Sequence, residues 1–317
     1  MIQVKRRLLF GAAALFALMC SMVPVCSAQV NAAPFLSIGG GARSIGLGGA
    51  FTAIADDATS TLWNPAGLVS VDDIAFTVST ARLTFDRKYN VLAAAKALGE
   101  TGAIGISVVN TGVDDIPRYS DADELQGQFN YNSNAFLVAY GHALEKMSFG
   151  ASIGLLTDSF GLDELDGNSK TGFAGIGLGF LGHTMYSGEM PTVSYGVSLR
   201  NLGGSIAGSS LPAVLELGVA FRLLKKNIAT FSFDLENEFV DIEESTTRVR
   251  LGVEYLIART FAIRGGAIAT RDRRSFFAGF GVNVSGLQLD YAFKPSDSTV
   301  HRLDDDETHY MSLSYSY

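Results

Sequence analysis

Charged residues are scarce in this sequence, and so are cysteine and histidine. Asp, Glu, Lys and Arg make up 18% of its 317 residues, whereas globular proteins average about 25%. Lys and Arg number 24 against 32 Asp and Glu, a net charge of −8, which disfavours nucleic acid as a partner because phosphate backbones carry the same sign. The composition also excludes a disordered chain, a collagen and a coiled coil. Something other than water is therefore expected to face much of the surface.

Both cysteines, Cys20 and Cys26, lie in residues 1–28, which are typical of a cleaved signal peptide. Basic residues at 5–7 precede an apolar stretch over 8–25 and small residues at 26–28. A retained N-terminal anchor is the alternative, and acylation is disfavoured because Met19 and Val25 precede the cysteines where a small residue is needed. Cleavage removes three basic and no acidic residues, so the net charge of −8 becomes −11. The exported chain then contains no cysteine, which excludes a disulfide framework, a thiol nucleophile and a cysteine-based metal site.

Histidine occurs at four positions, and none of them has metal-ligand spacing or a motif that pairs it with a nucleophile. We therefore expect no enzyme activity, no catalytic residue, no metal site and no cofactor. The acidic run at 304–307 lacks the spacing of a calcium loop and is interpreted as a solvated loop. The four histidines are His142, His183, His301 and His309.

Long apolar runs are missing after residue 28, which excludes a membrane helix of about 18 or more residues. The hydrophobic pattern instead has a period of two, which indicates strands. Met311, Leu313, Tyr315 and Tyr317 alternate with serines. A water-soluble sandwich alternates as well, so a soluble periplasmic or secreted β-protein is the alternative. The same period recurs in 215–222, 231–236, 249–255 and 287–293.

Fourteen strands are predicted, and the connections between them differ in length. An even-numbered antiparallel barrel with tight turns at one end and longer loops at the other predicts this difference, and strands of about 9–11 residues suit a tilted bilayer crossing. Short connections lie near 99–101, 145–146, 225–226, 258–259 and 285–286, and long acidic ones near 111–129, 161–169, 237–245 and 294–308. The strands are expected at 74–83, 88–96, 102–110, 130–142, 147–158, 170–181, 191–201, 212–222, 227–236, 246–256, 260–269, 275–283, 286–293 and 309–317.

The C-terminus also favours a membrane barrel. Tyr317 ends the chain as an aromatic residue, with apolar residues at every second position back to Met311, a pattern that outer-membrane barrels present to their insertion machinery. Pairing of the last strand with the first would close the sheet, because lipid does not tolerate an open edge. We therefore expect a multi-pass outer-membrane protein of a Gram-negative-type envelope, with membrane lipids and the insertion machinery as partners.

The most distinctive sequence lies before the first strand. Glycine-rich residues 39–49 lead to Asp56 and Asp57, and then to Trp63-Asn64-Pro65-Ala66-Gly67. At these residues the chain resembles the FadL-type outer-membrane barrel family, and most closely its PorV/PorQ-like branch. The residues themselves predict a short helix capped by Asp57 or Thr59 and an extended backbone before the proline. The alternative is that this segment only starts the barrel and positions its first strand, without a role in ligand binding.

Strand pattern and resemblance together predict an all-β fold: a 14-stranded antiparallel transmembrane barrel over 74–317. The resemblance implies that residues 29–73 form a plug within or beneath it. It also implies two functions. In the first, the barrel binds small hydrophobic, fatty-acid-like molecules or passes them across the outer membrane, although acidic outer loops disfavour an anionic substrate. In the second, which is PorV-like, it is a non-transporting structural or shuttle component of type IX protein secretion, and its partner is a secreted protein.

Charged residues on the polar strand faces form a further candidate site. If the apolar faces contact lipid, these charges point into the lumen. Arg248, Arg250 and Arg264 lie on neighbouring strands and would present a basic ladder to a carboxylate ligand. The alternative is a mixed-charge network that braces the wall, in which Glu254 and Asp234 pair with the arginines. The inward charges are expected to be Lys96, Arg200, Arg222, Arg248, Arg250, Arg264, Glu216, Asp234, Glu254 and Asp290.

Overall fold

The computed structural model describes residues 32–161, 169–184, 192–224, 228–241, 244–296 and 307–317. The predicted signal peptide lies outside these residues, as do His301 and the acidic positions 304–306. The helices are η1 (Pro34–Ser37), α2 (Ala42–Gly46), α3 (Ser60–Trp63) and η2 (Pro65–Ser70). The strands are β1 (Ile74–Arg82), β2 (Lys88–Leu98), β3 (Gly102–Tyr119), β4 (Leu125–Leu144), β5 (Met147–Phe160), β6 (Lys170–Thr184), β7 (Thr192–Leu202), β8 (Ser205–Ile206), β9 (Ser209–Ser210), β10 (Ala213–Leu224), β11 (Ile228–Asp241), β12 (Glu244–Ile257), β13 (Phe261–Ala269), β14 (Arg274–Val284), β15 (Leu287–Lys294) and β16 (Thr308–Ser316).

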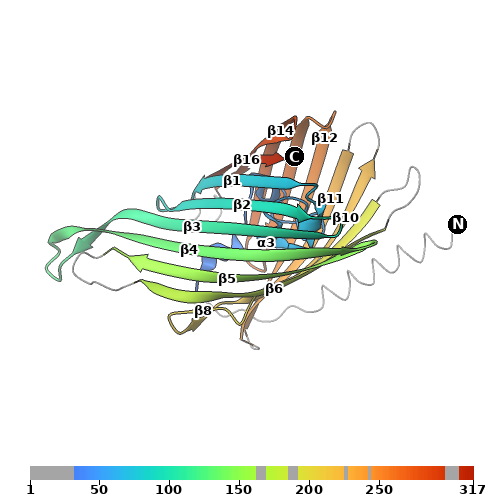
Figure 1. The fold of residues 1–317 in the computed structure, drawn as a ribbon. Coiled ribbons are helices and arrows are strands. Elements are labelled where there is room, and N and C mark those ends of the chain that lie inside the picture. Colours follow the sequence, from blue (N-terminus) through green and yellow to red (C-terminus); the bar gives the residue numbers. More distant parts are fainter. Residues whose placement is uncertain (1–31, 162–168, 185–191, 225–227, 242–243, 297–306) are drawn as a thin grey trace.

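The strands of the described residues form one closed antiparallel barrel (Figure 1). The order runs from β5 down to β1, continues with β16 down to β10, and ends with β7 and β6, and a pairing between β5 and β6 closes the circle. β8 and β9 form a short hairpin attached to β6. The last strand pairs with the first, with Ala75 opposite Ser316. The predicted barrel of fourteen antiparallel strands is confirmed.

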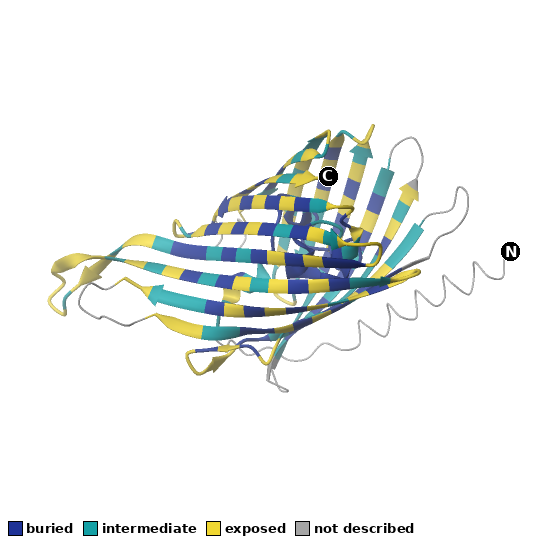
Figure 2. Cartoon of the chain, in the orientation of Figure 1, coloured by how far each residue is buried: buried dark blue, intermediate teal, exposed yellow. Residues whose placement is uncertain are grey.

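Buried and exposed residues alternate along the strands, which appears as bands across each arrow in Figure 2. On β1, Val78 is 53% exposed, whereas Thr77 and Ser79 on either side of it are buried. On β16, Met311 and Leu313 are about half exposed, whereas Ser312 is buried. Large apolar side chains therefore cover the outside of the barrel, whereas small and polar side chains make up most of its inner face. A water-soluble sandwich has the opposite arrangement, so the pattern favours a barrel in lipid.

The two ends of the barrel differ in their connections. At one end, here called the turn end, strands are joined by tight turns at 99–101, 145–146, 258–260 and 285–286. At the other, the hairpin end, β3 and β4 continue as a two-stranded ribbon beyond their other neighbours: β2 pairs with β3 only up to Gly112, and β5 pairs with β4 only from Tyr131.

Two of the predicted long loops are wrong. Residues 111–129 belong mostly to β3 and β4, which pair up to Tyr119 and Leu125 with two register shifts. Residues 237–241 and 244–245 likewise extend β11 and β12. Backbone pairing does not require apolar side chains, and alternation is lost where a strand no longer contacts lipid. The predicted loops at 161–169 and 294–308 lie mainly outside the described residues.

The described residues before β1, 32–73, are here called the N-terminal segment, and they lie inside the barrel (Figure 1). Leu47, Phe51, Trp63 and Leu68 of this segment have no exposed surface. Most of the core forms between them and the inner wall, which contributes small side chains such as Ala81, Ala135, Ala220 and Ala292. No helix among the described residues is long and apolar enough to span a membrane.

Glycines of the wall make room for this segment. A Cβ at Gly266 on β13 would collide with the backbone of Gly48, and one at Gly150 on β5 would collide with the backbone of Pro65. Backbone cannot yield as a flexible side chain can, so only glycine permits these close approaches. Part of the high glycine content is explained by the contact between the wall and the N-terminal segment.

Candidate functional site

Trp63 of α3 lies between two arginines of the wall. The guanidinium carbons of Arg200 on β7 and Arg250 on β12 are 5.8 and 5.9 Å from the centroid of its ring, within the range of cation–π attraction. Both arginines also bind the backbone of the N-terminal segment: Arg200 donates to the Leu62 carbonyl at 3.1 Å, and Arg250 donates to the Gly48 carbonyl at 3.3 Å. These two charges therefore fasten the segment to the wall.

Asn64 makes a second set of connections. Its side-chain amide donates to the carbonyls of Thr52 at 2.9 Å and Phe180 at 3.0 Å, and its oxygen accepts from the backbone N–H of Ala66 at 3.2 Å. The backbone of Asn64 is extended, with φ −152° and ψ 103°, before Pro65 starts η2. The predicted extended conformation is confirmed, and Asn64 joins two parts of the segment to β6.

Asp56 and Asp57 surround the guanidinium group of Arg43 on α2. Arg43 contacts Asp56 at 2.5 Å, Asp57 at 3.9 Å and Glu254 of β12 at 3.2 Å. Arg222 of β10 lies 4.0 Å from Asp56. The acidic pair of the motif is thus part of an ion cluster that links the segment to two strands.

Asp57 also shapes the start of α3. Its Oδ1 accepts from the backbone N–H of Thr59 at 2.8 Å and from the Thr59 hydroxyl at 2.6 Å. Thr59 occupies the N-cap position without a side-chain bond of its own to the helix. Burial raises the pKa of Asp57 above its usual value, against the opposing effect of Arg43.

The three arginines of the predicted basic ladder all point inward from neighbouring strands, and all three are paired with carboxylates. Arg248 contacts Glu236 and Glu238, and Arg250 contacts Glu236 at 2.6 Å and Glu216 at 3.5 Å. Arg264 contacts Glu254 at 2.7 Å and Asp290 at 2.6 Å. This arrangement favours bracing of the wall over a carboxylate site at these residues.

Two predictions about the inward charges are wrong. Asp234 forms no ion pair with an arginine among the described residues; instead its Oδ2 accepts the backbone N–H of Thr52 at 2.8 Å. Glu216 and Glu236 take its expected place. Lys96 is exposed on the outer face of β2, because Tyr89, Val91 and the other odd-numbered residues of that strand face inward. Its position near the end of the strand lets its long side chain reach water.

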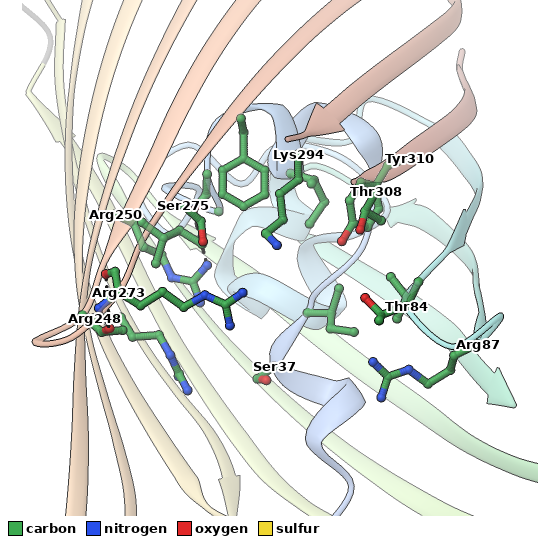
Figure 3. Close-up of a pocket in the computed structure, with 18 residues that line it drawn as sticks. Ser37, Thr84, Arg87, Arg248, Arg250, Arg273, Ser275, Lys294, Thr308 and Tyr310 are labelled. Atoms are coloured by element: carbon green, nitrogen blue, oxygen red, sulfur yellow. Dashed lines mark hydrogen bonds between the residues drawn. The ribbon is translucent and has the colours of Figure 1, made fainter. Parts of the chain in front are cut away.

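A cavity of about 410 Å³ lies at the hairpin end, above the N-terminal segment (Figure 3). Its cationic side chains come from both sides: Arg87 faces Arg248 and Arg273 across the cavity, and Lys294 points in from β15. No Asp or Glu occurs among the described residues that line it. Its apolar lining residues are Ile38, Ile45, Leu83, Ile268 and Phe277. This hairpin-side cavity combines a basic and an apolar surface.

A second cavity, of about 320 Å³, lies at the turn end. Arg43, Glu254 and Arg264 line it, together with residues of β13, β14 and β15. Arg43 faces this turn-side cavity, whereas Ile45, Gly48 and Gly49 face the hairpin-side cavity. Residues 43–49 are therefore the partition between the two spaces.

Sequence reasoning missed Arg87 as a candidate site residue. It immediately precedes β2, so the alternation that turns Tyr89 and Val91 inward also places Arg87 on the lumen side. The available signal was this alternation, extended by one residue before the expected start of the strand at 88.

Among the described residues, no group of three or more His, Cys, Asp and Glu is arranged to hold a metal.

Three residues of the predicted C-terminal signal lie in β16, and Tyr317 directly follows this strand. Met311, Leu313 and Tyr315 face outward, 40 to 53% exposed, and Tyr317 donates its backbone N–H to the Ile74 carbonyl at 3.0 Å. These contacts close the barrel; recognition by the insertion machinery stays a prediction.

The fold defines the class: a closed fourteen-stranded barrel whose lumen holds the segment that precedes its first strand. No protein-family model and no curated protein sequence matches the chain, but solved structures share its fold. The Ralstonia pickettii toluene transporter TbuX superposes with a TM-score of 0.58 at 12% identity, over 88% of this chain and 98% of its own. The CymD monoaromatic hydrocarbon channel superposes with a TM-score of 0.59 at 14% identity, over 88% of this chain and 98% of its own. A Pseudomonas aeruginosa FadL homologue superposes with a TM-score of 0.51 at 12% identity, over 93% of this chain and 100% of its own. The chain thus has a FadL-type barrel fold.

Proposed function

We propose that this protein is an outer-membrane barrel that binds small hydrophobic, fatty-acid-like molecules and passes them toward the periplasm. The hairpin-side cavity carries the proposal, because it is a concave space of about 410 Å³ with five apolar side chains in its lining. Ligand sites usually combine such a lining with a few polar groups. The neighbours described as a toluene transporter and a monoaromatic hydrocarbon channel support a small hydrophobic ligand. We assign the protein no enzymatic activity.

The orientation follows from the connections. Outer-membrane barrels carry short turns on the periplasmic side and longer connections outside, so the hairpin end faces the exterior and the turn end faces the periplasm. Membrane lipids then contact the exposed apolar side chains of the wall. A ligand from outside reaches the hairpin-side cavity first and meets residues 43–49 as its floor. Passage to the turn-side cavity requires movement of this partition.

The second candidate is the PorV-like role, a non-transporting component of protein secretion in the PorV/PorQ branch. One observation favours it: the ribbon of β3 and β4 projects past the wall and is acidic, with exposed carboxylates at Asp114, Asp115, Asp121, Asp123 and Glu124. Such a ribbon offers a surface to an exported protein.

Native mass spectrometry of the protein, extracted from its own outer membrane in mild detergent, distinguishes the two. The expected result is a folded species that retains one small lipid or fatty acid. An empty barrel in complex with a secreted protein would overturn the transport proposal and favour the secretion role. A matched sample in which the detergent is exchanged for one of different mass identifies bound detergent.

A further inference from the structure

We propose that the outer face of strands β1 to β5, near the hairpin end, binds a phosphorylated glycolipid of the outer leaflet of the membrane. The sugar hydroxyls bind a row of Asn and Thr side chains, the phosphate binds Arg82 and Lys88, and the acyl chains contact apolar side chains nearer the turn end. This inference uses the orientation given in the proposed function, in which the hairpin end faces the exterior. It concerns the outside of the wall and not the lumen.

Five polar side chains form one row across the outside of these strands, which are consecutive neighbours in the barrel (Figure 1). Each member lies directly opposite the next, on the face of its strand that carries the exposed apolar residues. The row, here called the polar row, consists of Thr80, Asn90, Asn110, Asn134 and Thr157. By contrast, the outward positions of β10 are all apolar from Ala213 to Leu223. The polar row is therefore a feature of one part of the wall.

Side-chain hydrogen bonds run through the polar row in one direction. Thr80 donates to Asn90 at 2.8 Å, and Asn90 donates to Asn110 at 3.4 Å. Asn110 donates in turn to Asn134 at 2.7 Å, and Asn134 donates to Thr157 at 3.3 Å. The amides and hydroxyls are thus held in a fixed orientation along the surface.

The polar row keeps hydrogen-bonding capacity for a ligand. A carboxamide has two N–H donors and an oxygen with two lone pairs. Asn110 uses both donors, because it also donates to Asn132 at 2.6 Å. Asn90 and Asn134 each use one donor and one lone pair within the row. Their remaining donors and lone pairs match hydroxyl groups, which both donate and accept.

The depth of the polar row calls for such a partner. Thr80 lies about 20 Å along β1 from Ile74, at the turn end of that strand. A strand tilted by about 40° needs about 33 Å to cross an apolar band about 25 Å tall. The outward apolar residues of β1, from Ile74 to Val78, cover only about 14 Å of this length. The row therefore lies where acyl chains would otherwise contact the wall, and unpaired polar groups are costly in hydrocarbon.

Basic side chains lie one step nearer the hairpin end. Arg82 is opposite Lys88, and both point outward. Arg82 contacts Asp86 at 3.3 Å and Lys88 contacts Asp114, and these four side chains are 46 to 84% exposed. Exposed ion pairs are weak, so a phosphate can replace the carboxylates and form charge-assisted bonds to both cations.

Apolar side chains lie on the other side of the polar row. Val78, Leu92, Phe136 and Leu155 are each two residues from a member of the row, and are 46 to 57% exposed. Toward the turn end, this part of the wall therefore presents basic groups, then amides and hydroxyls, and then an apolar surface. A phosphorylated glycolipid has its phosphate, sugar and acyl chains in the same order. A phospholipid lacks the sugar between phosphate and acyl chains.

The test is native mass spectrometry of the full-length exported protein in mild detergent, titrated with lipid A, a phosphorylated and acylated glucosamine disaccharide. Lipid A without its phosphates and phosphatidylglycerol are the comparison lipids. Asn110→Val removes the central amide of the polar row. Asn237→Val is its matched control, because Asn237 is an outward asparagine on β11, opposite Leu215 and Thr247.

A second pair of variants tests the phosphate contact. Arg82→Gln removes one of its two cations, and Arg274→Gln changes an exposed, outward arginine on β14 as the control. Heat-modifiable migration on a gel checks that all four variants fold.

We expect wild-type protein to bind lipid A at least about tenfold more tightly than phosphatidylglycerol. Asn110→Val weakens lipid A binding about tenfold, as the loss of one or two hydrogen bonds does, whereas Asn237→Val leaves it unchanged. Arg82→Gln weakens binding of lipid A but not of the form without phosphates, and Arg274→Gln changes neither.

Equal binding of lipid A and phosphatidylglycerol to wild type overturns the proposal, and so does equal lipid A binding by Asn110→Val and Asn237→Val. A dimer of this chain that Asn110→Val dissociates, with lipid A binding unchanged, assigns the face to a second copy and also overturns it. None of these outcomes alters the function proposed for the lumen.

Discussion

The side-chain amide of Asn64 donates to the backbone carbonyl of Phe180 at 3.0 Å, and so joins the N-terminal segment to β6 across 116 positions of sequence. Asn64 is fully buried, and the bond is partly buried. Contacts of this kind recur around the lumen, from β5 through β7 to β12 and β16. The N-terminal segment is therefore an integral part of the folded barrel, and its removal would leave buried polar groups of the wall without partners.

Asn64→Ala is expected to lower the stability of the folded barrel by about 1–3 kcal/mol, because the buried carbonyl of Thr52 and the partly buried carbonyl of Phe180 lose their donor. The measurement is the temperature at which the band of the folded protein disappears, when samples incubated at increasing temperatures are compared with an unheated sample on one gel. Asn90→Ala is the control, since the side chain of Asn90 is exposed and its hydrogen bonds are to other exposed groups. Equal stability of the two variants would contradict the role assigned to Asn64.

Gly266→Ala is expected to destabilise the barrel by about 1–3 kcal/mol, as overpacking of a dense interior does. Its new methyl group meets the backbone of Gly48 and Leu47, which cannot move away without shifting the partition. Gly265→Ala is a closely matched control, because a Cβ at Gly265 has nothing within 4 Å. Thermal unfolding of the two variants in the same detergent gives the difference between their stabilities. Equal stability of the two would show that residues 47–48 do not pack against β13.

Replacing Arg248 and Arg250 together by alanine is expected to lower the stability of the folded barrel strongly, because Glu216 and Glu236 lose arginine partners in the interior. Removing one side of a buried ion pair costs about 3–5 kcal/mol, and both arginines share Glu236. The measurements are thermal unfolding and decanoate affinity in nanodiscs. A loss of decanoate binding without loss of stability would restore the carboxylate site predicted from the sequence.

The single tryptophan of the chain provides a direct probe of the N-terminal segment. Trp63 has no exposed surface, so its fluorescence in the folded protein should resist quenching by iodide, and unfolding should make it accessible. Addition of a saturating ligand tests whether the partition moves during binding. Strong quenching in the folded, ligand-free protein would show that the segment lies outside the lumen.

A charge on the outer wall tests the membrane environment. Leu251→Arg places an arginine on the outside of β12, where Leu251 is 49% exposed, and is expected to cost about 2–4 kcal/mol near the bilayer midplane. Leu125→Arg makes the same change at the base of the turn between β3 and β4, where Leu125 is 63% exposed beyond the wall. We expect folding into lipid vesicles to be impaired only by the first change. Equal folding of both would argue against lipid contact at β12.

The barrel was predictable because a wall between lipid and lumen imposes a period of two on every strand. All fourteen expected strands are present, and their residues alternate as the pattern requires. The ribbon formed by β3 and β4 was not predictable in this way. Its residues beyond Gly112 and before Tyr131 contact neither lipid nor core, so their side chains carry no period, although the backbone pairing continues.

The candidate site was predictable only in part, for a related reason. Alternation gives the direction of a side chain, which is why Arg250 and Arg264 were correctly placed in the lumen. It does not give the partner across the barrel, so the pairing of Arg250 with Glu216, two strands away, required the three-dimensional arrangement. For Lys96 the direction itself was predicted wrongly. Successive residues of a strand face opposite sides, so an error of one position along β2 places the side chain on the wrong face.

The pairing of β1 with β16 sets an order of events during assembly. Ala75 lies opposite Ser316, so the circle of hydrogen bonds stays open until the last residues of the chain arrive. The N-terminal segment directly precedes β1, and its contacts reach strands on nearly all sides of the lumen. We expect it to take up its position while the sheet is still open, because Trp63 is fully buried between the segment and the wall. We therefore expect the N-terminal segment and the wall to fold together, with the barrel closing around the segment.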